Sequence, residues 1–258
     1  MSIEANLKKI VTVDTTAKLN PRLHTIFRLD GSNFSRYFKQ LELNRPYDDR
    51  LTNSMIETGI ECFNTFTFSL CYVGYDEITF YLKPVSKEEE DNGFEYDFSG
   101  RIQKMVSMLA GKASVIFYGK LIKYFGLENL PKCAPYWECK VTQTNHFDEV
   151  VENLNERIVS TLKNARNQFV NFHLPGTDLS SKEAIKKIQA DKQIDFNFEV
   201  SDNNKVGCII TYILAEFEKD VKFADSEELK SIKFIKKSPV CQNFNPLDVV
   251  NIKGDSLL

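Results

Sequence analysis

The sequence is poor in the residues that build transition-metal sites. Only three of its 258 residues are histidine, and none of its six cysteines stands in CxxC spacing. A zinc centre needs several nitrogen or sulfur ligands held close together, so the sequence argues against one. The cysteines are scattered over a long chain, which is typical of reduced intracellular thiols rather than of a disulfide framework.

Long apolar runs are also missing. No stretch of about 18 apolar residues is present, so we expect no membrane-spanning helix. Residues 1–20 carry Glu4 and Asp14 among the lysines and have no apolar core, so they do not read as a secretory signal. No arginine precedes Arg22, which fits a mitochondrial presequence poorly. We therefore expect a cytosolic protein, with the mitochondrion as the alternative.

The net positive charge that is usual in nucleic-acid-binding proteins is absent as well. The formal charge is −3 and the sequence pI is about 5.8. Binding to RNA needs only a local basic patch, so this balance does not exclude it. The chain is 42% hydrophobic and 27% charged, an ordinary globular composition. Its 20 Phe and 10 Tyr favour a mixed α and β fold over a helical bundle.

Hydrophobic periodicity in the first third predicts a strand, a helix and a hairpin. His24 to Asp30 is strand-like and ends in the turn-rich sequence Asp-Gly-Ser-Asn at 30–33. A helix follows from Asp48 or Asp49 to about residue 64. Residues 66–84 alternate with period two around Gly74, which indicates a hairpin. Asp30 then ends the first strand, and Asp76 lies at the hairpin tip.

The remaining two thirds of the chain are predicted in less detail. We expect helices at 99–110 and 147–169, with a short helix to about 190 that begins at a capping box of Ser180 and Glu183. Segments 113–121, 136–142, 195–200 and 206–214 look like strands, the last two joined by residues 202–204. Residues 87–93 read as a loop, and the last forty residues are weakly patterned. These elements define an α/β (α+β) fold class.

Two carboxylates at adjacent strand ends are suited to binding Mg²⁺. This cation prefers oxygen ligands and usually keeps substrate phosphates in its coordination shell. Two such ions can assist an in-line displacement at phosphorus. The carbonyl of Gly31 can add a ligand, and the amides of residues 32–34 can form an anion nest. The alternative is structural: Asp30 serves a turn and Asp76 a hairpin tip.

Several motifs together resemble the tRNA-His guanylyltransferase family, and within it the like-protein branch that repairs tRNA 5′ ends. These motifs are FRLDGSNFSRY (27–37), RPYDDR (45–50), YDEITF (75–80) and Arg101, Lys104 and Ser107 at three-residue spacing. The resemblance covers residues 23–110 specifically, and 147–169 and 174–212 more loosely. It implies a polymerase-palm-like antiparallel sheet with helices on one face. It also implies one catalytic domain, with the palm core at about 23–145 and a helical and hairpin arm at about 146–258.

The same resemblance implies a role for each matching residue. Asp30, Asp76 and the carbonyl of Gly31 would hold two Mg²⁺ ions, with Glu77 as a supporting catalytic carboxylate. Arg101 and Lys104 would grip the triphosphate of an incoming nucleotide. The complete nucleotide-binding set is Gly31, Ser32, Asn33, Phe34, Ser35, Arg45, Asp48, Tyr75, Arg101, Lys104 and Ser107. Candidate RNA contacts on the long helix are Lys163, Asn164, Arg166 and Asn167.

The resemblance further implies a reaction and an assembly. A 5′-monophosphate RNA end is activated with ATP, and the 3′-hydroxyl of GTP or another NTP then attacks it. Family members are homotetramers that bind tRNA across subunits.

Departures from the family pattern bear on which reaction the chain carries out. The family usually has histidine where Ser35 stands, lysine where Arg45 stands and serine where Tyr75 stands. Its His-Ile-Asn-Asn-x-Tyr-Asn stretch aligns with residues 161–167, of which only the asparagines remain. We therefore expect template-dependent 5′-end repair. The alternatives are addition of the extra 5′ guanosine to tRNA-His, an inert RNA-binding protein on the same scaffold and, remotely, a nucleotide cyclase.

Overall fold

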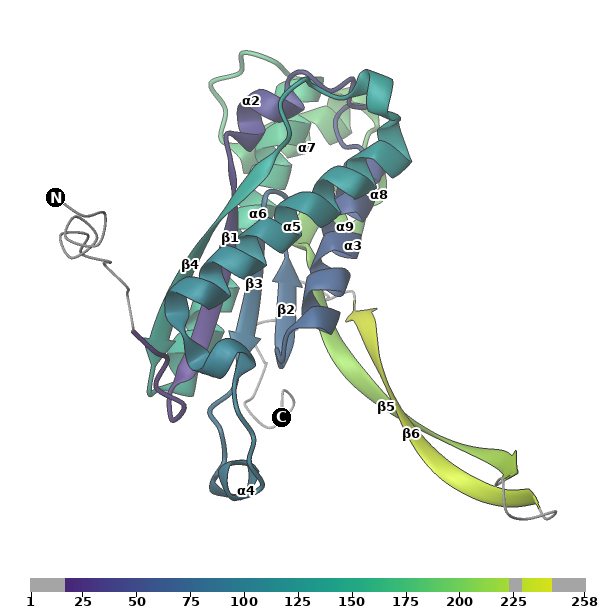
Figure 1. Cartoon of the computed structure of the whole chain (residues 1–258). Helices are drawn as coiled ribbons and strands as arrows, with labels where there is room; N and C mark the ends of the chain where they lie inside the picture. Colours follow the sequence, from purple (N-terminus) through teal and green to yellow (C-terminus); the bar gives the residue numbers. More distant parts are fainter. Residues whose placement is uncertain (1–16, 223–228, 243–258) are drawn as a thin grey trace, which may run out of the picture.

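One six-stranded antiparallel sheet organises the fold. The computed structural model describes residues 17–222 and 229–242, with side chains up to residue 211. The strands lie in the order β4-β1-β3-β2-β5-β6 (Figure 1). Their bounds are β1 His24–Ser32, β2 Leu70–Val73, β3 Glu77–Leu82, β4 Tyr136–Thr144, β5 Cys208–Lys222 and β6 Leu229–Gln242. Only the first residues of β5 pair with β2, so β5 and β6 continue as a two-stranded ribbon that leaves the body of the protein (Figure 1).

The larger core lies between the sheet and two helices, α3 (Asp49–Thr65) and α5 (Ile102–Phe125). Alternate residues of β1, Phe27 and Leu29, are fully buried on this side. Helix α5 faces them with residues spaced by four. The buried residues of α5 are Met105, Leu109, Ala113, Phe117, Leu121 and Phe125. This packing places the end of β1 beside the middle of α5.

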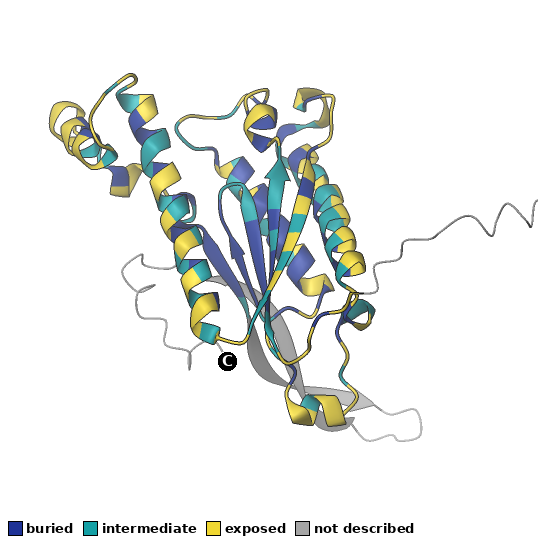
Figure 2. Cartoon of the chain, turned by 90° about the vertical axis from the view of Figure 1, so that its left-hand side faces the viewer, coloured by how far each residue is buried: buried dark blue, intermediate teal, exposed yellow. Residues whose placement is uncertain are grey.

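The opposite face of the sheet is covered only in part, by α6 (Phe147–His173). Ile26, Tyr72 and Tyr81 of the sheet are buried there together with Val150, Leu154 and Ile158 of α6, as one cluster. The outermost strand on this side, β4, has an exposed and half-exposed surface (Figure 2). An open strip therefore remains beside α6 along β4 and β1.

Shorter elements complete the chain. Helix α2 (Phe34–Phe38) follows β1, α4 (Lys87–Asp91) and η1 (Asp97–Gly100) precede α5, and η2 (Leu127–Asn129) follows it. Helices α7 (Ser181–Lys192), α8 (Phe196–Glu199) and α9 (Asp202–Val206) lie between α6 and β5. A third apolar cluster joins the end of α6 to α7 and α8.

The mixed helix and antiparallel-sheet class predicted from the sequence is confirmed. The strand–helix–hairpin unit, β4, the long helix and the capped helix α7 are also confirmed. Two structural predictions fail after residue 110. Residues 113–121 are helical, because Ala113, Phe117 and Leu121 continue the buried stripe of α5 and packing overrides their β propensity.

The second error lies at 195–204. Residues 195–200 form α8 instead of a strand, because the Asp195 carboxylate accepts a hydrogen bond from the Asn197 amide, 2.8 Å away, and caps the helix. Residues 202–204 belong to α9 rather than to a turn between two strands. The segment 206–214 is mostly β5, which pairs with β2 and β6.

Residues 87–91 form a short capped helix where we expected a loop.

Within the described residues, α5 alone is long and apolar enough to cross a membrane by length and composition. A helix in the core of a folded protein meets the same criterion, and α5 packs against α3 and β4.

Candidate active site

The structure brings Asp30 and Asp76 to the same end of the sheet. The Gly31 amide donates a hydrogen bond to the Asp76 carbonyl, with 3.2 Å between nitrogen and oxygen. Asp30 stands directly opposite Glu77 on β3 and opposite Glu138 on β4. Paired residues of antiparallel strands project to the same face, so three carboxylates form a row across the sheet. This is the face that α6 leaves partly open.

Burial and mutual repulsion act on the carboxylates of the hairpin tip. Removal from water raises the pKa of Asp76, and the nearby charge of Asp30 raises it further. Burial also raises the pKa of Glu77, while Arg157 of α6 opposes that shift from 3.6 Å. A site that holds like charges together at half-buried positions favours a bound cation.

Two arginines accompany the carboxylates. Arg28 lies two residues before Asp30 on the same side of β1, and Arg157 approaches from α6. The Nε atoms of both arginines and the hydroxyl of Thr79 are buried and have no hydrogen-bond partner among the described residues. Arg28 and Thr79 face each other across β1 and β3. The metal-binding candidates therefore lie beside two half-buried positive charges.

The turn after β1 depends on Gly31. A side-chain carbon at this position would overlap the ring of Phe34. Phe34 is 2% exposed and packs between Phe117 and Trp137, with ring centroids 5.3 and 4.7 Å away. Asn33 has a left-handed backbone with φ 57°. The Phe34 side chain thus belongs to the core, and only its backbone is placed to meet a nucleotide.

A second loop meets the hairpin tip. The Tyr75 ring contacts Phe38 edge-on at 6.0 Å, and burial raises its pKa while the charge of Arg45 lowers it. The Tyr47 hydroxyl donates to the Ala165 carbonyl of α6. Ser32 is half-buried at the end of β1, and Ser35 is exposed. The residues predicted around the nucleotide thus gather at this end of the sheet, apart from the α5 set.

Asp48 already has several partners. Its side chain is buried and accepts hydrogen bonds from the Asn44 amide at 2.8 Å and from the Arg50 amide at 3.0 Å. The Arg50 guanidinium completes the cluster at 2.7 Å and holds the pKa of Asp48 low, against the effect of burial. Asp48 caps α3 in this way. A base contact through its side chain would require these bonds to rearrange.

Thr161 of α6 lies beside the hairpin tip, at the position where the family pattern has histidine. Thr161 is 5% exposed. The Tyr72 hydroxyl donates a hydrogen bond to the Thr161 hydroxyl oxygen, 2.8 Å away. A side-chain carbon on Gly74 would lie 3.1 Å from the Thr161 oxygen. The aligned position therefore does approach the tip, but with a small neutral side chain.

The predicted triphosphate grip lies elsewhere in the chain. Arg101, Lys104 and Ser107 begin α5, at the end of the sheet where β1 starts (Figure 1). The backbone of Arg101 forms an isolated antiparallel β-bridge with that of Lys18. The Lys104 ammonium lies over the Phe98 ring, 4.9 Å from its centroid. On α5, the residue level with Gly31 is near Ser114, because the Ser114 hydroxyl bonds the amide of Trp137, which pairs with Gly31. Along the helix axis Ser114 lies about 20 Å from Arg101, about 15 Å from Lys104 and about 10 Å from Ser107. One chain does not bring these three residues to Asp30.

Some of the candidate RNA-contact residues are exposed to solvent, and one is hydrogen-bonded within the protein. Lys163 and Asn164 are exposed on α6, and Arg166 is half-buried. Asn167 accepts a hydrogen bond from the Ser181 hydroxyl at 2.5 Å and so joins α6 to α7.

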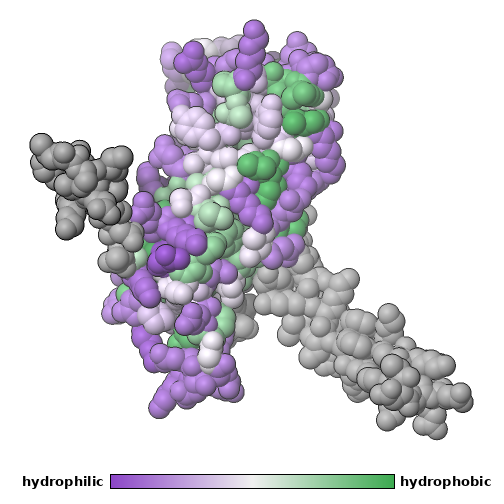
Figure 3. Space-filling view, in the orientation of Figure 1, coloured by the Kyte–Doolittle hydropathy of each residue, from purple (hydrophilic) through white to green (hydrophobic). Residues whose placement is uncertain are grey.

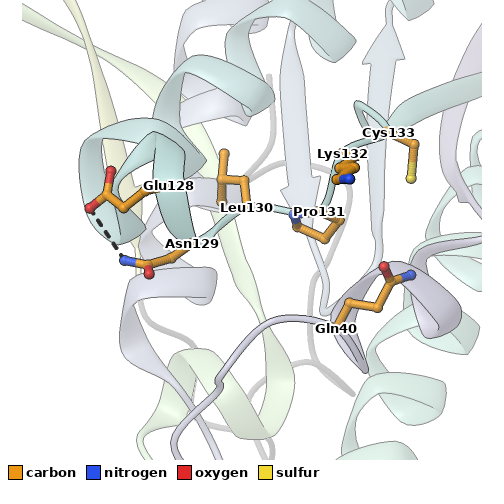
Figure 4. A pocket seen from close by; sticks show the side chains of 7 residues that line it. All are labelled: Gln40, Glu128, Asn129, Leu130, Pro131, Lys132 and Cys133. Atoms are coloured by element: carbon orange, nitrogen blue, oxygen red, sulfur yellow. Dashed lines mark hydrogen bonds between the residues drawn. The ribbon is translucent and has the colours of Figure 1, made fainter.

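A shallow hollow lies apart from the predicted residues. It is formed by the segment after α5 and by Gln40, which follows α2 (Figure 4). Its lining residues are Gln40, Glu128, Asn129, Leu130, Pro131, Lys132 and Cys133. None of them was predicted to bind nucleotide.

The donor set at the strand ends fits a hard cation. The described residues contain no group of three or more His, Cys, Asp or Glu side chains arranged as a metal site. Two aspartates and a backbone carbonyl would leave the remaining positions to water and phosphate, as Mg²⁺ commonly requires. The residues therefore fit an ion that arrives with its nucleotide.

Sequence reasoning missed three neighbours of the site. Arg28 was recognisable, because it shares a strand face with Asp30 at two-residue spacing. Arg157 gave no signal beyond its charge. Glu138 could not be predicted, because the sequence of neither strand determines how β1 and β4 align.

Together, the antiparallel sheet and its paired aspartates define a palm-like domain of the nucleotidyl-transfer class. A model of the tRNAHis guanylyltransferase (Thg1) family matches residues 7–148, which is more than half of the chain. The chain therefore belongs to this family of nucleotidyltransferases, and the family predicted from the motifs is confirmed.

Solved structures share the fold. A bacterial tRNA(His) guanylyltransferase (Thg1)-like protein in complex with ATP is 19% identical with a TM-score of 0.72, and the match covers 97% of this chain and 96% of that one. A bacterial like-protein in complex with GTP is also 19% identical (TM-score 0.66), covering 92% and 89%. The Saccharomyces cerevisiae tRNA(His) guanylyltransferase is 18% identical (TM-score 0.64), covering 77% and 90%.

A viral relative matches in sequence. The uncharacterized protein R259 of Acanthamoeba polyphaga mimivirus is 30% identical over 102 residues, which is 39% of this chain. The match spans about a third (34%) of that protein's length.

Proposed function

We propose that the chain adds nucleotides to the 5′ end of tRNA in the 3′-to-5′ direction, with base pairing to the acceptor strand selecting each nucleotide. The observation that carries the proposal is the pair of Asp30 and Asp76 at one open end of the sheet, in a chain of the tRNAHis guanylyltransferase family. Like-proteins of this fold bind ATP and GTP, which supports nucleoside triphosphates as substrates.

In the proposed reaction, the 3′-hydroxyl oxygen of an incoming nucleotide bonds to the 5′ phosphorus of the RNA. Pyrophosphate leaves if the end is a triphosphate, and AMP leaves if ATP has activated a monophosphate. Two bound Mg²⁺ ions would supply charge neutralisation for the phosphates. Asp30, Asp76 and the Gly31 carbonyl would hold them. Arg28 and Arg157 would keep Glu77 ionised and fixed behind Asp76.

The environment of Thr161 favours repair over guanosine addition specific to tRNA-His. Its hydroxyl is engaged by Tyr72 and nearly buried. The aligned position near Gly74 therefore offers a threonine hydroxyl in place of an imidazole, so templating by the acceptor strand is the simpler source of selectivity.

A truncated tRNA separates these reactions. A tRNA other than tRNA-His, lacking its first nucleotide, is supplied with all four NTPs and Mg²⁺. We expect one templated nucleotide to be restored, with a faster reaction from a 5′-triphosphate. Addition of guanosine to tRNA-His alone would support the identity enzyme instead. Cyclic products from ATP or GTP alone would reveal a cyclase.

The inert RNA-binding alternative is tested by Asp76→Ala. We expect this variant to lose extension while retaining binding of the truncated tRNA in a filter assay. Glu149→Ala, at an exposed acidic residue of α6, is the matched control and should extend normally. Unchanged extension by Asp76→Ala would overturn the metal assignment.

We also propose that the enzyme is a homotetramer, in which the predicted grip by Arg101 and Lys104 serves a nucleotide of another subunit. The distance along α5 within one chain motivates this proposal. Subunits carrying Lys104→Ala are mixed with subunits carrying Asp76→Ala. Recovered extension in the mixture supports action between subunits, and no recovery contradicts it.

A further inference from the structure

The hollow that follows α5 contains an exposed thiol. Its volume is about 450 Å³, and Cys133, Lys132 and Gln40 are among the residues that line it (Figure 4). Of the free cysteines that the structure describes, Cys133 alone is exposed. Burial raises the pKa of the Cys62 and Cys139 thiols to about 12, so these two stay protonated at neutral pH. Because the thiolate is the reactive form of cysteine, Cys133 is the accessible nucleophile of the described part of the chain.

A buried hydroxyl near this thiol has no partner. Tyr37 of α2 is 4% exposed, and its hydroxyl makes no hydrogen bond with the described residues. Burial, and then the nearby Tyr118 and Cys133, raise the pKa of Tyr37 to about 12. The hydroxyl therefore lies on the side of α2 that faces Cys133. Because an unpaired buried hydroxyl is unfavourable, a ligand in the hollow that bonds it gains affinity.

The rim of the hollow complements a short zwitterionic peptide. Lys132 is exposed and has no ion-pair partner among the described residues. The side-chain nitrogens of Gln40 and Asn129 donate to backbone carbonyls at 3.3 and 2.7 Å, so their side-chain oxygens remain as acceptors. Glu128 adds a carboxylate. These groups match the carboxylate, amide N–H and ammonium groups of a peptide.

Apolar surface accompanies these polar groups. Leu130 and Pro131 also line the hollow. Figure 3, in the orientation of Figure 1, shows hydrophobic side chains beside hydrophilic ones around the C-terminal end of α5, where the hollow begins. A ligand with both polar ends and an aliphatic body therefore suits the hollow better than a simple anion does.

We propose that the hollow is a site of covalent modification, in which Cys133 forms a mixed disulfide with a small zwitterionic peptide. The thiol loses its proton to water, and the thiolate attacks one sulfur of a symmetrical peptide disulfide. The new S–S bond forms as the old one breaks, and the second peptide leaves as a thiolate that takes up a proton. Cys133 is oxidised, and the departing peptide is reduced. Lys132 binds a carboxylate of the retained peptide, and the Tyr37 hydroxyl bonds one of its polar groups.

The bound peptide connects two parts of the chain. The segment 128–133 forms one side of the hollow, and Gln40 forms the other. The Gln40 backbone amide donates to the Tyr37 carbonyl at 3.0 Å, which fixes Gln40 to the end of α2. A peptide that is bonded to Cys133 and contacts α2 makes these contacts only in the folded protein. Such a ligand stabilises the folded state.

Oxidised glutathione is the probe, and hydroxyethyl disulfide is the matched probe without charges or amides. The reduced full chain is mixed with each, and intact-protein mass spectrometry follows the adducts; Cys133→Ser measures the reaction at the remaining cysteines. We expect Lys132→Met to slow the glutathione reaction about fivefold, as loss of an exposed ion pair predicts, and to leave the hydroxyethyl reaction nearly unchanged. Lys186→Met, at an exposed lysine of α7, is the matched control and should react as the wild type does.

The melting temperatures of the two adducts test the contacts of the bound peptide. We expect the glutathione adduct to melt at a higher temperature than the hydroxyethyl adduct. Tyr37→Phe keeps the buried ring and removes the hydroxyl, so it should reduce this difference.

Three results would overturn the proposal. The first is an adduct that forms as fast in Cys133→Ser as in the wild type. The second is an equal rate of glutathione modification in Lys132→Met and Lys186→Met. The third is one melting temperature for both adducts, since Cys133 would then be an exposed thiol without a peptide site.

Discussion

Asp76→Asn should raise the stability of the protein while abolishing its reaction. The pKa of Asp76 is raised above its ordinary value of 3.8, first by burial and then by Asp30. The folded protein therefore binds a proton at Asp76 more tightly than the unfolded chain does. The stability due to this group is greatest below the unfolded pKa and falls as the pH rises through the folded pKa. At pH 7 the ionised Asp76 opposes folding.

The size of the effect follows from the geometry. Asp76 adjoins Glu77, the residue opposite Asp30. Opposite and diagonal side chains of neighbouring strands lie about 5–8 Å apart, and two charges at such distances repel by roughly 2–3 kcal/mol at an effective dielectric constant of 20. Both aspartates are partly exposed, and solvent screening reduces this to about 1–2 kcal/mol. The asparagine keeps the shape of the side chain and removes the charge. We expect a gain of this size at pH 7.

Urea unfolding at several pH values measures the gain. It should be present at pH 7 and disappear below about pH 4, where both forms are neutral. It should also shrink in an Asp30→Asn background, because the repelling charge is then gone. Mg²⁺ at ten times its dissociation constant should stabilise the wild type by about 1.4 kcal/mol, and the variant much less. A gain that is independent of pH, or additive with Asp30→Asn, would refute the reasoning.

Three other substitutions test the surroundings of the site. Arg157→Met should destabilise the protein by about 1–3 kcal/mol, because it leaves the half-buried Glu77 charge without its ion-pair partner. In urea unfolding, the double variant with Glu77→Gln should regain most of the lost free energy of unfolding. Gly31→Ala should reduce extension at least about 100-fold, because the new methyl group displaces Phe34 and the turn that carries the metal ligands; a rate near the wild type would contradict this. Thr161→Val should cost about 1 kcal/mol through loss of the bond to Tyr72, and an unchanged melting temperature would argue against that bond.

The first third of the fold was predictable because its signals are local. The capping residue of α3, the period-two alternation of the hairpin and the turn sequence after Asp30 each depend on neighbours within a few residues. The approach of Asp30 and Asp76 followed from placing both at strand ends, and the Gly31–Asp76 hydrogen bond bears that placement out.

The parts that failed depend on contacts distant in sequence. Residues 113–121 have good β propensity, and only their burial beneath the sheet makes them helical. The row of Asp30, Glu77 and Glu138 requires the register of three strands. Motif resemblance assigned Arg101 and Lys104 to the nucleotide without giving their position in space, and the structure shows them at the far end of the sheet.

The most direct test of the account is nucleotide incorporation at a truncated 5′ end. Wild-type protein and Asp76→Asn are each given a tRNA lacking its first nucleotide, bearing a 5′-triphosphate, with Mg²⁺ and labelled NTPs. We expect the wild type to add the nucleotide complementary to the opposing acceptor-strand base. We expect the more stable Asp76→Asn to add none. Extension at the 3′ end, or equal 5′ extension by both proteins, would contradict it.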